Sequence, residues 1–153
     1  MTFEEPAYGL DEGRPERSIT IVWSLGLRKR SGGYLRCAVM SATKGMAQRL
    51  VASFPRLQPA LLEHLSANDE LLPHVFMGDV ARHVTDSYLF ANACDGSLRA
   101  LLDWLEEEFA GGGAEKQELL AVSFVESLPR ADEQGRGIVE CLGPRLRAEA
   151  DRL

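Results

Sequence analysis

The spacing of the hydrophobic positions changes at Met46. From Met46 onward, apolar residues recur every three or four positions, and the clearest run places Phe76, Val80, Val84 and Tyr88 four residues apart. Such a stripe covers one face of a helix and is typical of a buried face. Before Met46, β-branched, glycine and basic residues are mixed without this period. The pattern predicts a helical domain over residues 46–153 and a leader over residues 1–45.

Proline, glycine and capping residues mark the ends of the predicted helices. Asp95 is of the type that caps a helix start, and three glycines at 111–113 end the helix that follows. Pro144 cannot donate a helical hydrogen bond, so the last helical stretch should break next to it. The predicted helices span about 46–53, 59–66, 73–91, 97–110, 114–128 and 137–153. Because short loops make sequential helices antiparallel neighbours, we expect an all-α fold, either a compact bundle or a short stack of about six helices.

The leader has the composition of a β-hairpin preceded by a polar tail. Residues 18–27 and 34–41 are rich in strand formers, and residues 28–33 between them read as a turn. An isolated hairpin is marginal in water, so we expect the leader to form a β-hairpin or to be disordered. A second interpretation takes Met46 as the natural start of the protein and residues 1–45 as upstream sequence that was never selected to fold. The residues leave both interpretations open.

Charge is unevenly distributed between these two parts. The net charge is −6, with seven Lys/Arg against five Asp/Glu in residues 1–45 and ten against eighteen in residues 46–153. An acidic domain repels phosphate backbones, so we expect no nucleic-acid partner, whereas a basic protein would be attracted to it. No apolar run is long enough to span a bilayer, and we expect no membrane partner. Cys37, Cys94 and Cys141 have no metal-ligand spacing, which predicts reduced thiols in a cytoplasmic protein.

Four sequence motifs give the helical domain a family resemblance. They are NDELLPHVFMGDVAR (68–82), LLDWLEEEF (101–109), LLAVSFVESLP (119–129) and LGPRL (142–146). In this order they resemble the motifs of a family of small uncharacterised bacterial all-helical domains, over about residues 46–153. Members of that family look like companions of polymorphic-toxin loci, so the resemblance implies an immunity protein. It implies no catalytic residue.

The helix predicted over 97–110 ends in an unusual cluster of acids. Glu106, Glu107 and Glu108 lie where the helix dipole disfavours anions, and broken local rules are enriched at functional surfaces. Trp104 lies among these acids and off the leucine stripe, as an interface anchor would. A solvated acidic surface is the alternative interpretation. The candidate partner-binding residues, taken from this helix and from the one before it, are Asp79, Asp86, Asp103, Trp104, Glu106, Glu107 and Glu108.

Three functions follow from these observations. The leading hypothesis is a non-enzymatic, acidic protein-interaction domain, in its sharpest form an immunity-type neutraliser whose partner is a basic toxin. The second is a small metal-dependent hydrolase or metal-binding regulator, because Asp79 and His83 are four residues apart on one helix and such pairs can hold a metal ion. Two-residue matches are common by chance, and we expect no cofactor and no catalytic residue. The third is a structural scaffold domain, and the sequence leaves the oligomeric state open.

Overall fold

The computed structural model describes residues 34–153, with side chains described from residue 42 onward. The described part is helical and contains no strand, which confirms the all-α prediction. Its α-helices are α1 (Tyr34–Ser53), α2 (Gln58–Asn68), α3 (Pro73–Ala91), α4 (Gly96–Gly111), α5 (Ala114–Glu118) and α6 (Pro144–Ala150). Other helical turns join them, namely η1 (Pro55–Leu57), η2 (Leu119–Phe124), η3 (Val125–Ser127) and η4 (Arg136–Cys141).

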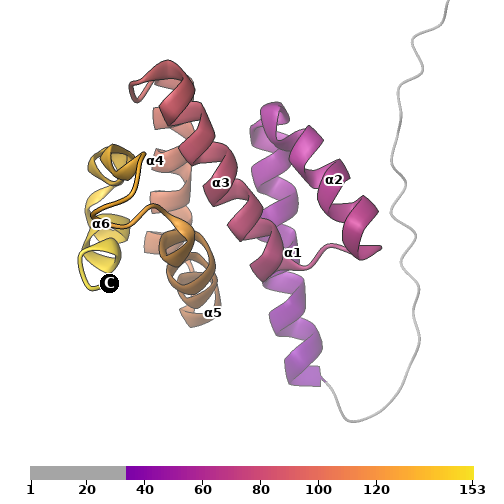
Figure 1. Cartoon of the computed structure of the whole chain (residues 1–153). Helices are drawn as coiled ribbons and strands as arrows, with labels where there is room; N and C mark the ends of the chain where they lie inside the picture. Colours follow the sequence, from indigo (N-terminus) through magenta and orange to yellow (C-terminus); the bar gives the residue numbers. More distant parts are fainter. Residues whose placement is uncertain (1–33) are drawn as a thin grey trace, which may run out of the picture. The chain divides into compact units, whose positions relative to one another are not determined.

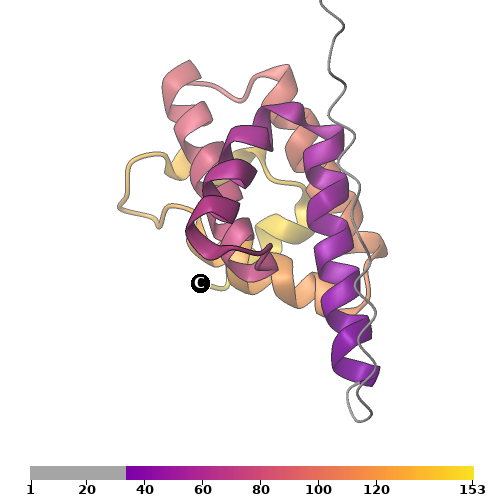
Figure 2. The ribbon, with the colours of Figure 1, turned by 90° about the vertical axis from the view of Figure 1, so that its right-hand side faces the viewer.

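α3 is the central helix of this region. It packs against α1, α2 and α4 and, most extensively, against η2. Figure 1 shows α3 crossing the middle, with α1 and α2 on one side and α5 and α6 on the other. Figure 2, seen from the side of α1 and α2, shows α2 lying in front of α3. One long side of α3 therefore adjoins α2.

α1 begins at Tyr34, well before Met46, so the helix start that the hydrophobic pattern predicted is wrong. Residues 34–41, which were expected to form a strand, belong to this helix. Strand propensity depends strongly on context, and each residue added to an existing helix gains a hydrogen bond, so the continuous helix prevails over the local preference. The other predicted strand (18–27), the turn and the polar tail lie outside the described residues.

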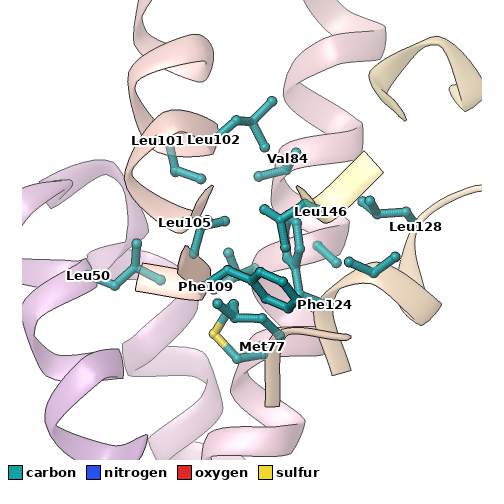
Figure 3. Close-up of a cluster of buried hydrophobic side chains, with 14 of the residues drawn as sticks. Leu50, Met77, Val84, Leu101, Leu102, Leu105, Phe109, Phe124, Leu128 and Leu146 are labelled. Atoms are coloured by element: carbon teal, nitrogen blue, oxygen red, sulfur yellow. The ribbon is translucent and has the colours of Figure 1, made fainter. Parts of the chain in front are cut away.

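The predicted hydrophobic stripes meet in one core. Phe76, Val80, Leu105 and Phe124 are fully buried, and Leu101 is 6% exposed. Figure 3 shows side chains of this core, from α1, α3, α4, η2 and α6, pointing toward one another. Full burial of an aliphatic or aromatic side chain stabilises the fold by about 1.5–3 kcal/mol. These stripes therefore hold the helices in place around α3.

The helix predicted over 114–128 is not a regular α-helix. It begins as α5, widens into the π-helical turn η2 and tightens into the 3₁₀ turn η3. A π turn has its hydrogen bonds between residues five apart, and in η2 it leaves Leu119, Leu120, Ser123 and Phe124 buried together. Ser123 Oγ lies 2.6 Å from Nδ1 of His74 at the start of α3. The wider turn places these two successive pairs on a narrower face than the 3.6-residue period of an α-helix would.

The C-terminal segment breaks where proline predicted. η4 is a 3₁₀ turn rather than an α-helix, and α6 begins with Pro144 at its first position. Leu146 of α6 is fully buried. This short helix therefore contributes to the core although it has only two turns.

Candidate functional site

The first residue of the acidic cluster on α4 is bound to the start of α6. Glu106 Oε1 accepts a hydrogen bond from the backbone N–H of Arg145 at 2.9 Å, and Oε2 accepts one from that of Leu146 at 3.0 Å. The first N–H groups of a helix have no acceptor within the helix, and the dipole there favours a carboxylate. Glu106 therefore caps a helix that begins about forty residues later in the chain.

A glycine makes room for this cap. A Cβ atom at Gly143 would lie 2.5 Å from Cγ and Cδ of Glu106, closer than any side chain tolerates. A larger residue at this position would displace the carboxylate from the two N–H groups. The Leu-Gly-Pro sequence at 142–144 thus combines a helix break, space for the cap and a proline suited to the first helical position.

Glu108 is held between two cations. Arg49 of α1 donates to both carboxylate oxygens at 2.9 Å, and Lys116 of α5 donates to Oε2 at 2.8 Å. Burial by itself would raise the pKa of Glu108, but the hydrogen bonds and charges of Lys116 and Arg49 outweigh it and lower the pKa from its ordinary value. The ionised carboxylate therefore joins α1, α4 and α5.

The remaining candidate residues of α4 are divided between solvent and core. Asp103 and Glu107 are exposed, and no hydrogen bond or salt bridge engages either of them within residues 42–153. Trp104 is partly buried, and its ring packs edge-on against Phe54 with 6.3 Å between the ring centroids. The acids of α4 therefore do not form one continuous surface.

A second acidic surface lies between α2 and α3, where the structure has a groove of about 350 Å³. We call it the α2–α3 groove, and its lining residues are Pro59, Ala60, Glu63, His64, Ala67, Asn68, Val75, Asp79, Arg82, His83 and Asp86. It brings the predicted residues Asp79, His83 and Asp86 together with Glu63, which sequence analysis did not select. The acids of α4 are not part of this lining.

The base of the groove is fixed by His64, whose side chain is completely buried. Its Nε2 accepts a hydrogen bond from the backbone N–H of Leu72 at 3.1 Å. Nδ1 must then carry the ring proton, which it donates to Asp79 Oδ2 at 3.0 Å. Asn68 Nδ2 donates to the carbonyl oxygen of His64 at 2.9 Å. His64 thus joins α2, the loop after it and α3, and nothing in its local sequence distinguishes it from a surface histidine.

The basic residues of the groove do not neutralise its acids. Arg82 is paired with Asp79, with 2.8 Å between Nη2 and Oδ1. Burial and the neighbouring Arg56 lower the pKa of His83 from 6.5, although Asp86 opposes this shift. The imidazole of His83 is therefore uncharged at neutral pH.

Two carboxylates are left facing the groove without a basic partner. Glu63 and Asp86 are both exposed. Within the described side chains, no hydrogen bond or salt bridge engages either carboxylate. The groove consequently has a net negative charge at neutral pH.

Asp79 and His83 belong to no larger set of metal ligands among the described residues. The two carboxylate oxygens of Asp79 are engaged by His64 and Arg82. No group of three or more His, Cys, Asp or Glu side chains in the described part of the chain is placed to hold a metal ion. The metal-dependent hypothesis therefore has no ligand set among these residues.

Comparison with known proteins assigns the chain to a family. A family model described as a domain of unknown function (DUF7674) matches residues 47–152. No curated protein and no solved structure matches the chain. Because the match covers more than half of its length, the chain belongs to the DUF7674 family, in keeping with the predicted resemblance to a family of uncharacterised domains. Among the described helices, none has both the length and the apolar character needed to cross a membrane.

Proposed function

We propose that this DUF7674 member is a non-enzymatic protein-interaction domain whose α2–α3 groove accepts a basic segment of a partner protein. One observation carries the proposal. Glu63 and Asp86 face the groove without a basic partner, while the nearby Arg82 is already paired and His83 is uncharged. A Lys or Arg side chain of a partner would complete the pairing of these carboxylates.

The groove is a stronger candidate than the acidic cluster of α4. Glu106 and Glu108 already accept hydrogen bonds from α6, α1 and α5, so a partner would have to break those contacts in order to use them. Asp103 and Glu107 have no such contacts to break. The neighbouring Trp104, which was predicted to anchor a partner, is however already packed on Phe54. Variants of Asp103 and Glu107 therefore serve to compare the predicted α4 surface with the groove.

An immunity-type neutraliser is the specific form of this proposal. A basic toxin would be attracted to the acidic groove, and the bound domain would block access to the toxin's own substrate. Charge complementarity mainly accelerates association, and salt screens it. We therefore expect the affinity of the complex to fall as ionic strength rises.

Two charge-reversal pairs test which surface binds. Glu63→Lys/Asp86→Lys alters the groove, and Asp103→Lys/Glu107→Lys alters α4 by the same number of charges. Each tagged variant is used to capture partners from cells of the source organism. The enriched protein is then identified, purified and titrated against each variant by calorimetry. We expect the groove pair to weaken binding of a basic partner at least about tenfold, or 1.4 kcal/mol, and the α4 pair to leave it nearly unchanged.

The same two pairs of substitutions also give the results that would contradict the proposal. Equal weakening by both pairs would mean that only net charge matters, and loss confined to the α4 pair would place the interface there. A purified partner that binds all variants alike, with no dependence on salt, would rule out the electrostatic mechanism. All four positions are exposed, so unchanged thermal unfolding should confirm that each variant is folded.

A further inference from the structure

The outward face of α3 has an apolar residue near each end and charged residues between them. Val75 is 49% exposed and Phe90 is 96% exposed. Asp79, Arg82 and Asp86 lie between them at intervals of three or four residues, so all five share one face of the helix. The two apolar residues are fifteen positions apart, which corresponds to about 22 Å along the helix axis.

This face forms a ridge between two hollows. The α2–α3 groove lies on one side, and a second groove of about 340 Å³ lies on the other, against Ser127, Pro129 and Glu133. The residues that line both grooves are Val75, Asp79, Arg82 and Asp86. A partner that lay along the ridge could therefore insert side chains on both of its flanks.

The exposure of Phe90 calls for an explanation. Single exposed apolar side chains are ordinary on protein surfaces, but a phenylalanine that is almost wholly exposed leaves a large hydrophobic area in water. Phe90 also continues the line of groove residues that passes through Asp79 and Asp86. An apolar side chain of a partner placed over Phe90 would bury this area at the end of the groove.

We propose that the occupant of this surface is a basic amphipathic helix of the partner protein. It lies along α3, with apolar side chains over Val75 and Phe90 and Lys or Arg side chains between them, against Asp86 and Glu63. The inference rests on the proposed function and specifies the form of the partner. A helix fits because its side chains recur at the same axial intervals as those of α3, as in other helix-in-groove complexes.

Charge decides between this occupant and a second copy of the chain. A symmetric pair of copies would place the same face of each against the other, and Asp86 and Glu63 would then meet like charges. A basic helix instead meets charges of opposite sign. The complementary charge therefore favours a different, basic partner.

A designed peptide tests the inference directly. The probe is a fluorescein-labelled helix of about 18 residues, with Leu fifteen positions apart on one face, Arg and Lys between them on that face, and Ala elsewhere. Its binding to the full chain is followed by fluorescence anisotropy. We expect Phe90→Ser to weaken binding about tenfold and Val75→Ser about threefold, because each removes an apolar contact. Val122→Ser is the matched control, since Val122 lies outside both grooves and is 47% exposed, and it should have no effect.

Other outcomes overturn the inference. The inference is wrong if the basic peptide does not bind. It is also wrong if a peptide with Glu in place of Arg and Lys binds equally tightly. A third result is binding that is lost in Glu63→Lys/Asp86→Lys but unchanged in Phe90→Ser and Val75→Ser. That result would support the proposed function and would exclude a partner helix that lies along α3. Concentration-dependent self-association that Phe90→Ser abolishes, measured by light scattering, would make a second copy the occupant.

Discussion

Glu106 and Glu108 of α4 look like Glu63 and Asp86 of the α2–α3 groove in the sequence, but the two pairs have different surroundings in the structure. Glu106 binds the first N–H groups of α6, and Glu108 binds Arg49 and Lys116. Glu63 and Asp86 face a groove without such partners. The run of three glutamates is the more conspicuous feature of the sequence, but two of its residues already have partners within the chain. Glu63 and Asp86 are therefore more available to a partner than Glu106 and Glu108 are.

Replacing the buried histidine at the base of the groove should give the largest effect. His64→Ala would leave the Leu72 N–H and the Asp79 carboxylate without their partner and would open a cavity beneath the groove. We expect a loss of about 3 kcal/mol in the free energy of unfolding, measured by urea denaturation. Glu63→Ala, at the exposed neighbouring position, should change it by less than about 0.5 kcal/mol. Similar losses in both variants would show that His64 has no special role.

The second largest effect should be a difference in stability between variants of two adjacent glutamates of α4. Glu108→Lys would place a third cation between Arg49 and Lys116 and should destabilise the domain by about 2 kcal/mol. Glu107→Lys makes the same change of charge at an exposed position and should have little effect on the midpoint of thermal unfolding. If the two variants unfold at the same temperature, the ion pairs of Glu108 contribute nothing to stability.

A double-mutant cycle examines the cap of α6. Glu106→Ala should reduce the free energy of unfolding by about 1 kcal/mol, which is typical of a lost helix cap. Gly143→Ala should reduce it by a similar amount in the natural chain, because the new Cβ displaces Glu106, and by much less once Glu106 is alanine. Chemical denaturation of the four proteins gives the coupling. Additive losses would mean that Gly143 acts on the backbone alone.

The smallest expected effect is the pH dependence contributed by His83. Its pKa in the folded chain is lowered below 6.5, mainly by burial. Between 6.5 and the lowered pKa, the unfolded chain binds a proton that the folded chain does not, so stability falls as pH drops through this interval. His83→Gln should remove this contribution, which we expect to be under about 1 kcal/mol because the ring is partly exposed. The free-energy difference between the two proteins, compared at pH 8 and pH 5.5, should therefore change, whereas a constant difference would contradict the prediction.

Local periodicity predicted much of the fold. The span 73–91 was predicted for α3 and is observed, and Asp95 caps α4 by accepting a hydrogen bond from the Leu98 N–H. These features depend on residues close together in the sequence. The start of α1 was missed because its first residues have strand propensity, and the π turn η2 was missed because no residue type specifies it.

The candidate site was less predictable because it depends on pairs that are distant in sequence. Asp79 and Asp86 were selected from one helix, but Glu63 enters the groove only through the packing of α2 on α3. The contact between Glu106 and Leu146 likewise spans forty positions. Sequence spacing gives the side of a helix on which a residue lies, while the partner on that side depends on tertiary structure.

The cap on α6 has a consequence for the order in which the chain folds. A segment of seven residues is well below the length of about 12–15 residues at which an isolated helix begins to persist in water. Its first N–H groups find their acceptor on α4, so this segment should become ordered only after α4 has docked. A synthetic fragment covering 142–153 should accordingly be a random coil by circular dichroism, and protection of its amide protons from exchange would then report closure of the entire bundle.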